Sequence, residues 1–361
     1  MLPRNCIQLF SFALIIWVSA LGAILISCSN SAQTVGGADR LPFVAVMQLI
    51  NQPTLNQIRD GLEDALAEAG YTADSTLRWE WLSSQGNPIA AAQIASKYAA
   101  AKPDVIVAIA TPMAQAAVNA AGNIPVIFSA VSDPVSANLI EAPEKPNRNI
   151  SGVSNAFPVE QSIALIREVL PEAKTLGVVY SATEGNAVNL LNLIRAQAPE
   201  QGFITVKEVI VGADQQAIEL ARSMIGSVDA IYVLQSQNNG QNNGQSNSQS
   251  NSQRNGQSNS VVGLALVSAV AQVGRDNDVP VFAGGIEGVK SGAITGISLD
   301  YYAMGRQTGE MVLKVLRGDK ASDLPVELAK GIKLFINLPA AAEMGITLPD
   351  TVIERADTVV K

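Results

Sequence analysis

Short polar turns follow several apolar runs in this chain, and they hold most of the side chains that could bind a ligand. Thr111 follows the run 105–110, and Ser132-Asp133 follows the run 125–131. The turns that share this pattern come after Ile50, Ala110, Val131, Tyr180, Leu234 and Ala283. Because open parallel sheets bind ligands outside the carboxyl ends of their strands, we expect these turns to face one cleft.

Thr111-Pro112 predicts the start of a helix directly after a buried strand. A Thr hydroxyl commonly caps a helix, and Pro112 stands where a first helical residue would. The free amides of such a helix turn attract a carboxylate, a phosphate or a sugar hydroxyl. An ordinary helix cap has the same sequence, so both interpretations stay open.

Asp133 is a candidate partner for a cationic group on a ligand, because it stands at the carboxyl end of an expected strand. An Asp at this place also caps a following short helix. Trp79 and Trp81 pose a similar choice, because they could stack on a ligand or pack along an edge strand.

Composition narrows the class of protein. Hydrophobic residues make up 48% of the 361 residues and aromatic residues only 5%, which predicts a core of aliphatic side chains and Ala. The net charge is -8 and no cluster of Lys and Arg is present. Nucleic acid is therefore not an expected partner.

The residue types that most enzymes use are largely missing. The chain has no His, and its two Cys, Cys6 and Cys28, both fall within the first thirty residues. Neither a Gly-x-Gly-x-x-Gly motif nor a phosphate-binding Lys motif occurs. We therefore expect no catalytic residues, no metal and no cofactor, as in a protein that is not an enzyme.

Strand-like and helix-like segments alternate along most of the chain. Buried runs such as 43–50, 176–180 and 230–234 are typical of parallel strands, and amphipathic stretches lie between such runs. The alternation predicts an α/β protein with two doubly wound parallel-sheet (Rossmann-like) lobes. A length of 361 residues suits two lobes of ordinary size.

Residues 1–27 are typical of a signal peptide with a lipobox. Arg4 supplies a positive start, an apolar stretch follows, and Leu25-Ile26-Ser27-Cys28 resembles the bacterial lipobox, whose Cys is diacylated. Residues 28–41 then predict a flexible tether. We expect lipidation at Cys28 and an extracytoplasmic location, anchored by lipid to a bacterial membrane in the periplasm or on the outer cell surface. An uncleaved membrane anchor is the alternative.

Residues 235–260 contain only Gln, Asn, Ser, Gly and one Arg. Such a segment cannot bury enough apolar surface to order itself, so we predict a disordered Gln/Asn/Ser-rich insertion. It is either a tolerated loop expansion or a flap at the mouth of the cleft.

Several motifs carry a resemblance to one known family. They are AIATPMAQAA at 108–117, VIFSAVSDPV at 126–135, ISGVS at 150–154, VEQSIALIREVLPEAKTLGVVY at 159–180, VDAIYV at 228–233, PVFAG at 280–284 and GISLDYYAMGRQTGEM at 296–311. From Pro42 onward the chain resembles the substrate-binding proteins of ABC importers, with the type I periplasmic-binding fold. More narrowly, it is similar to the group that includes tryptophan and aromatic amino-acid binders.

The resemblance implies a Venus-flytrap receptor that closes on a small ligand, an amino acid and in the narrower case an aromatic one, and delivers it to an ABC permease. It implies three hinge crossings, expected near 153–155, 294–296 and 322–326. Lobe 1 would then hold residues 42–154 plus 295–322, and lobe 2 residues 155–294 plus 323–361. The expected partners of this monomer are its ligand, the permease and the membrane.

Capture of an amino acid would use the polar turns. A ligand carboxylate would bind the amides at Thr111 and Met113 and the Thr111 hydroxyl. For the ammonium group, Asp133 and Asp300 are the leading candidates and Glu287 is a weaker one. Asp300 equally predicts a cap for the helix that follows it. The groups that could complete the site are Ser132, Ser154, Glu184, Gly185, Asn186, Ala187 and Asn238.

The chain departs from the family pattern by carrying fewer charges near the expected cleft. Asn51-Gln52 stand where members often have an acid or a His, and Asn155 follows Ser154 where an acid is frequent. After Val233, an acid beside an Asn is replaced by the sequence 234–238, LQSQN. A ligand of the sugar or nucleoside type is the alternative that these changes leave open.

Two other functions occur with this kind of fold. A transcriptional regulator would need a pair of DNA-binding helices at the N-terminus, where the signal sequence stands here. A ligand-sensing receptor that is not coupled to transport fits the sequence as well as an importer's receptor does.

Overall fold

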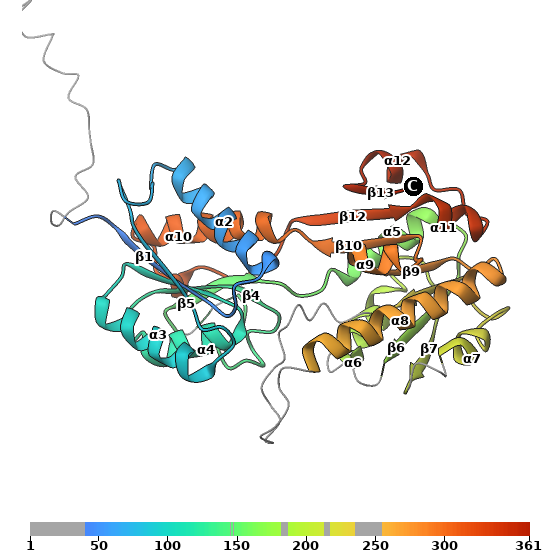
Figure 1. Cartoon of the computed structure of the whole chain (residues 1–361), viewed down its shortest axis with the longest axis horizontal. Helices are drawn as coiled ribbons and strands as arrows, with labels where there is room; N and C mark the ends of the chain where they lie inside the picture. Colours follow the sequence, from blue (N-terminus) through green and yellow to red (C-terminus); the bar gives the residue numbers. More distant parts are fainter. Residues whose placement is uncertain (1–39, 145, 147, 182–186, 213–216, 235–254) are drawn as a thin grey trace, which may run out of the picture. The chain divides into compact units, whose positions relative to one another are not determined.

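Continuous apolar runs form the central strands of two sheets in the computed structural model, which describes residues 40–361 apart from 145, 147, 182–186, 213–216 and 235–254 (Figure 1). Helices connect most successive strands, and the middle strands of both sheets are wholly buried. The predicted fold class, two parallel-sheet α/β lobes, is confirmed. Leu41–Lys361 form one compact unit.

The first lobe contains a six-stranded sheet with the order β11-β5-β4-β3-β1-β2. Its strands are β1 (Phe43–Gln48), β2 (Arg78–Ser83), β3 (Val105–Ile109), β4 (Val126–Val131), β5 (Ile150–Ser154) and β11 (Glu327–Leu328). Its helices are α2 (Pro53–Glu68), α3 (Pro88–Ala101), α4 (Thr111–Ala120), α10 (Tyr301–Leu316) and the 3-10 helix η2 (Ala321–Asp323). All of these strands pair in parallel, so their carboxyl ends share one edge.

The second lobe contains a seven-stranded sheet with the order β13-β12-β10-β9-β8-β6-β7. Its strands are β6 (Thr175–Ser181), β7 (Thr205–Val211), β8 (Ala230–Val233), β9 (Val281–Gly284), β10 (Thr295–Leu299), β12 (Ile332–Asn337) and β13 (Thr358–Val360). Its helices are α5 (Val159–Val169), α6 (Ala187–Gln197), α7 (Ala217–Arg222), α8 (Asn255–Asp276), α9 (Gly285–Lys290), α11 (Leu338–Glu343) and α12 (Asp350–Glu354). β12 is antiparallel to β10, so this sheet is mixed at one side.

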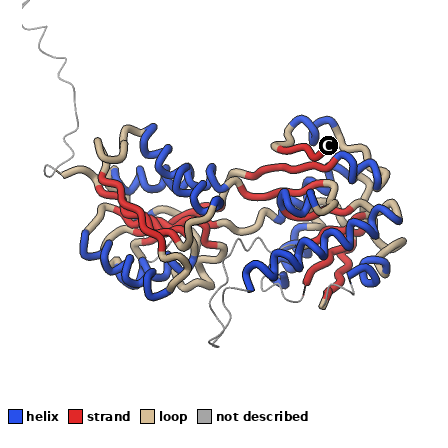
Figure 2. Tube along the Cα trace, viewed as in Figure 1, coloured by secondary structure: helices blue, strands red, loops and turns tan. Residues whose placement is uncertain are grey.

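The chain passes between the two sheets three times. The first crossing follows β5 at Ser154, the second lies at Asp300 between β10 and α10, and the third runs from β11 to β12. Figure 2 shows β10 and β12 as adjacent strands, and their pairing ends at Leu299 and Ile332, next to the second and third crossings.

Two of the expected crossings are wrong by a few residues. Residues 295–299 form β10 of the second sheet, so the chain does not cross near 294–296 but at Asp300. Glu327–Leu328 still pair with β5 of the first sheet, so the third crossing lies beyond 322–326. Ladder hydrogen bonds decide where each strand ends, and the apolar pattern of the sequence does not show them.

The expected boundary of the polar insertion also changes. Residues 255–260 lie in α8, whereas 235–254 lie outside the described residues. Gln, Asn and Ser are mediocre helix formers but not helix breakers, so the helix formed by the apolar residues beyond 260 extends backward into the polar run.

Helices α2 and α10 pack against each other unusually closely. A Cβ atom added at Gly305 would lie 2.1 Å from the Ile58 carbonyl oxygen, and one at Gly61 would lie 2.2 Å from the Tyr302 carbonyl oxygen. Tyr302 Oη donates to Asp64 Oδ2 at 2.7 Å along the same contact. The backbones therefore approach to a distance that only Gly permits, and this fixes α10 on the first lobe.

We predict that Gly305→Ala lowers the free energy of unfolding by about 3 kcal/mol, because the added methyl group meets backbone that cannot move without separating the helices. Glu310→Ala, an exposed change on the same helix, should stay within about 0.5 kcal/mol of the original protein. Urea unfolding of both variants measures the difference, and equal stabilities would contradict the close packing.

Candidate functional site

The carboxyl edge of the first sheet brings together several of the polar residues singled out in the sequence. β3, β4 and β5 are neighbours in that sheet, so Thr111 and Ser132, which follow β3 and β4, lie at the same edge as Ser154, the last residue of β5. Ser132 Oγ donates to Asn155 Oδ1 at 3.1 Å, and Ser154 Oγ donates to the Ser132 carbonyl oxygen at 3.2 Å. The polar turns after β4 and β5 therefore form one hydrogen-bonded group at the first crossing.

Two alanines at this edge adopt backbone conformations that favour Gly. Ala110, directly after β3, has φ 84°, and Ala130, near the end of β4, has φ 57°. The pairing of β4 with β5 shifts register between Ser129 and Val131, so Ala130 forms a bulge. Each such conformation costs about 1–3 kcal/mol, and strained backbone of this kind is concentrated at functional sites.

The helix after β3 begins one residue earlier than the sequence suggests. Ala110 is the N-cap, Thr111 is already helical, and no side chain caps α4, so the predicted cap role of Thr111 is wrong. The conformation of Ala110 turns the chain before Thr111, which explains the shift. Thr111 is partly exposed at the first turn of α4.

Met113 does not offer the free amide that was expected of it. Its amide donates to the Ala110 carbonyl oxygen at 3.1 Å, and its side chain is fully buried in the first core. We therefore discard Met113 as a ligand contact. An amide can bind a ligand only if the helix does not already use it.

The Asp133 side chain caps the turn that follows β4. Its Oδ1 accepts from the amides of Val135 at 3.1 Å and Ser136 at 2.9 Å, and its Oδ2 accepts from Ser136 Oγ at 2.6 Å. The residue is exposed, and its carboxylate oxygens have further lone pairs available. It therefore stays available to a cation while it holds the turn 133–137.

Asp300 also caps a helix. Its Oδ1 accepts from the Ala303 amide at 3.0 Å at the start of α10, and its Oδ2 lies 3.5 Å from Lys333 Nζ. Glu287 lies in α9, exposed and paired with Lys290 Nζ at 3.2 Å. Both acids already face a lysine, which makes them weaker partners for a ligand's ammonium than Asp133.

Most of the remaining candidates lie outside the residues that the structure describes. Glu184, Gly185, Asn186 and Asn238 lie outside the described residues, as does Cys28 with the expected signal peptide. Ala187 is the first residue of α6. Their expected contributions therefore remain predictions.

Gln48 is a buried polar residue that was not among the residues predicted from the sequence. It ends β1, is 0% exposed, and its Nε2 donates to the Ile50 carbonyl oxygen at 2.7 Å and to Asn56 Oδ1 at 2.8 Å. Its Oε1 has no hydrogen-bond donor within the described part of the chain. A polar residue that closes an apolar strand was the available signal, and the residue fixes the segment that leads into α2.

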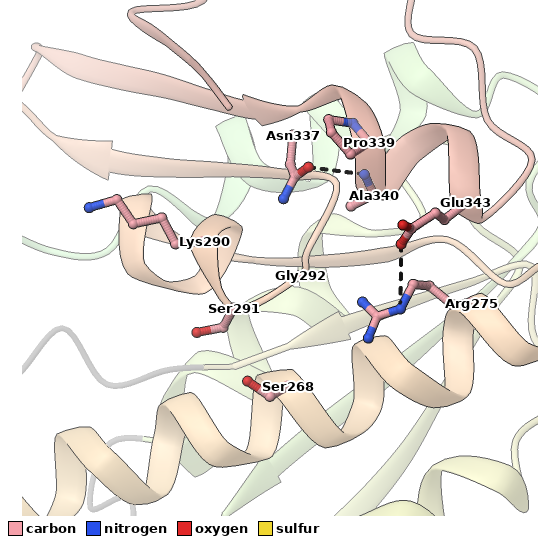
Figure 3. Close-up of a pocket in the computed structure, with 9 residues that line it drawn as sticks. All are labelled: Ser268, Arg275, Lys290, Ser291, Gly292, Asn337, Pro339, Ala340 and Glu343. Atoms are coloured by element: carbon pink, nitrogen blue, oxygen red, sulfur yellow. Dashed lines mark hydrogen bonds and ion pairs between the residues drawn. The ribbon is translucent and has the colours of Figure 1, made fainter. Parts of the chain in front are cut away.

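A pocket of about 370 Å³ lies elsewhere, in the second lobe (Figure 3). Ser268, Arg275, Ser291 and Asn337 are among its lining residues, and Arg275 Nε lies 3.5 Å from Glu343 Oε2. Ser291 precedes β10 and Asn337 ends the antiparallel β12, so the pocket lies at the amino end of β10. None of the expected site residues lines it.

The described residues contain neither a membrane-spanning helix nor a cluster of metal ligands. No helix there is long and apolar enough to cross a membrane. No group of three or more His, Cys, Asp and Glu residues there is arranged to hold a metal ion.

The two lobes, the three crossings and the polar edge define a protein of the type I periplasmic-binding class. A model of the family described as ABC transporter substrate binding protein matches residues 43–255 and 257–360. The chain therefore belongs to the ABC transporter substrate binding protein family.

Several proteins are similar to this one over most of the chain. A tyrosine-binding protein of Clostridioides difficile is 29% identical over 294 residues, which cover 81% of this chain and 78% of that protein. The ligand-free, open structure of a substrate binding protein with adhesive properties from Clostridium difficile has a TM-score of 0.75 at 29% identity, covering 89% of this chain and 100% of that one. An ABC domain from Streptococcus pneumonia in complex with L-Trp has a TM-score of 0.58 at 29% identity, with the same coverage of 89% and 100%.

We predict that Asp133→Ala lowers the free energy of unfolding by about 1 kcal/mol, because the amides of Val135 and Ser136 lose their acceptor. Asp133→Asn keeps an oxygen in the same place, so it should lose less than half of that. Chemical denaturation measures both values. Equal losses would mean that the charge of Asp133, and not its acceptor oxygen, stabilises the turn.

Proposed function

We propose that this protein is the extracytoplasmic receptor of an ABC importer and that it binds an aromatic amino acid at the carboxyl edges of the two sheets. The observation that carries the proposal is the edge of β3, β4 and β5, where two strained alanines and the hydrogen-bonded turns at Ser132 and Ser154 lie together. The tyrosine-binding relative and the structure with L-Trp support the choice of ligand class.

Thr111 and Asp133 are the contacts that we assign to the amino-acid backbone of the ligand. Thr111 stands at the uncapped start of α4, where the helix dipole favours the ligand carboxylate. Asp133 stands at the end of the neighbouring strand β4, and no Lys or Arg in the described part of the chain forms an ion pair with it. A carboxylate there attracts the ligand ammonium, whereas Asp300 is already opposed by Lys333.

The binding mechanism that we assign is hinge closure with a shift of population. A ligand that touches both lobes stabilises the closed form by the contacts that exist only there. The three crossings supply the hinge, since the chain between the two sheets is short at each of them. Residues 184–187 and Asn238 would contribute from the second lobe.

The remaining parts of the proposal follow from the N-terminal sequence and the family. A diacyl group on Cys28 would hold the domain at a bacterial membrane, outside the cytoplasm, through the tether 28–41. The protein would act as a monomer, hand its ligand to the permease of the importer, and carry out no chemical reaction. Transport and not sensing is the output that the family description favours.

We predict that Tyr, Trp or Phe raises the melting temperature of the protein, because a ligand that binds only the native state stabilises it by mass action. At one hundred times the Kd, this amounts to about 2.7 kcal/mol. Asp133→Asn should weaken binding at least tenfold, and Asp300→Asn should weaken it less than threefold. Thermal unfolding gives the shift in melting temperature, and titration calorimetry gives the Kd, for the parent protein and for the two variants.

Each contrary outcome removes a different part of the proposal. A shift with sugars or nucleosides only would keep the receptor and overturn its ligand class. Strong loss with Asp300→Asn and none with Asp133→Asn would exchange the two acids. No shift with any amino acid, sugar or nucleoside would contradict the receptor function.

A further inference from the structure

The backbone of the third crossing passes from the hydrogen-bond ladder of the first sheet to that of the second sheet between residues 329 and 331. On the side of the first lobe, the Ala329 amide donates to the Ser154 carbonyl oxygen at 2.9 Å, which extends the pairing of β11 with β5. On the side of the second lobe, the Asp300 amide donates to the Gly331 carbonyl oxygen at 3.0 Å, which extends the pairing of β10 with β12. Lys330 lies between these two ladders, so its amide needs a partner from outside both.

The side chain of Gln307 supplies that partner. The Lys330 amide donates to Gln307 Oε1 at 3.2 Å, and Gln307 Nε2 donates to the Leu328 carbonyl oxygen at 3.0 Å and to Glu327 Oε2 at 2.7 Å. Gln307 lies on α10 and is only 7% exposed. Its buried side-chain amide therefore attaches residues 327, 328 and 330 of the crossing to the helix.

Charges strengthen the same attachment. Glu327 Oε2 lies 2.8 Å from Lys330 Nζ, and its other oxygen lies 3.9 Å from Lys314 Nζ. Burial alone would raise the pKa of the Glu327 carboxyl, but the hydrogen bonds from Lys330 and Gln307 hold that pKa below its usual value. Glu327 is therefore charged at neutral pH and accepts these bonds at full strength.

The attachment to α10 restrains the backbone of the third crossing from residue 327 to residue 330. A Cβ atom at Gly331 would lie 2.6 Å from Ala303 Cβ, so the crossing touches the first turn of α10 there. Beyond this point the chain enters β12 of the second sheet. Gly331, which has no Cβ atom to restrict its backbone, is therefore the residue at which the third crossing can bend between the attached segment and β12.

We propose that Gln307 is a positioning residue for ligand binding: by holding residues 327–330 on α10, it confines the bending of the third crossing to Gly331. Gln307 acts through the crossing and touches no ligand. A hinge with one bending point reaches a defined closed form, and a hinge with several reaches many forms that bind less well. This role rests on the receptor function proposed above.

The first test measures how tightly the two lobes are held in the absence of ligand. Spin labels would be placed on the full chain at Ala92→Cys of α3 and Lys207→Cys of β7, both exposed positions, with Cys6→Ser and Cys28→Ser removing the other thiols. Pulsed electron spin resonance should give a broader distance distribution for Gln307→Leu than for the labelled parent. Equal widths would overturn the proposal, whether or not a ligand is known.

The second test measures affinity. For Gln307→Leu we expect binding of the aromatic amino acid to be at least fivefold weaker by calorimetry at 25 °C, measured on variant protein whose circular dichroism spectrum matches that of the parent. Unchanged or tighter binding would overturn the positioning role. If the parent protein binds no aromatic amino acid, the proposed ligand is wrong and the spin-label result alone decides the role of Gln307.

Two control variants separate positioning from stability and from charge. Val312→Ala removes a buried side chain from the same helix, so it should lower the melting temperature and leave both the affinity and the distance distribution unchanged. Glu327→Gln removes the ion pairs with Lys330 and Lys314 but keeps an oxygen for Gln307 Nε2, so it should weaken binding clearly less than Gln307→Leu does. If Val312→Ala lost as much affinity as Gln307→Leu, the effect of Gln307 on binding would come from stability alone. The positioning role would then be wrong.

Discussion

The packing of α10 on the first lobe is the constraint on which the rest of the structure depends. The helix begins at the second crossing, contacts α2 through Gly305 at a distance that no other residue permits, and holds the third crossing through Gln307. Thr308 Oγ1 also lies 2.9 Å from Ser129 Oγ, next to the bulge of β4. One helix therefore connects the hinge to the strand whose end carries the candidate ligand contacts.

The contact between α10 and β4 also bears on the two strained alanines at the carboxyl edge of the first sheet. Ala110 and Ala130 hold conformations that would relax in a loosely packed protein, and both are 0% exposed in the first core. The buried sheet and α10 keep them in place, so the turns that follow present Thr111 and Asp133 in a fixed arrangement. A site that is ordered before the ligand arrives binds at a lower entropic cost.

The sequence predicted the fold well and the site only in part. Alternating apolar runs and amphipathic stretches were sufficient for the two α/β lobes, because burial imposes that pattern on each strand and helix, but they did not show the antiparallel β12. The cap at Ala110 could not be foreseen, since its positive φ comes from tertiary packing and Thr111-Pro112 is a good helix start in any case. The second and third crossings were misplaced because ladder hydrogen bonds, and not hydrophobicity, end β10 and begin β12. Gln307 was missed because its role comes from a strand twenty residues further along the chain.

Small-angle X-ray scattering with and without an aromatic amino acid tests the central claim most directly. Binding that bridges the two lobes must favour a closed form, so the radius of gyration should fall at ligand concentrations where calorimetry shows saturation. An identical scattering profile at saturation would show that the ligand binds without closure, and it would contradict this account of how the crossings and the strand ends work together.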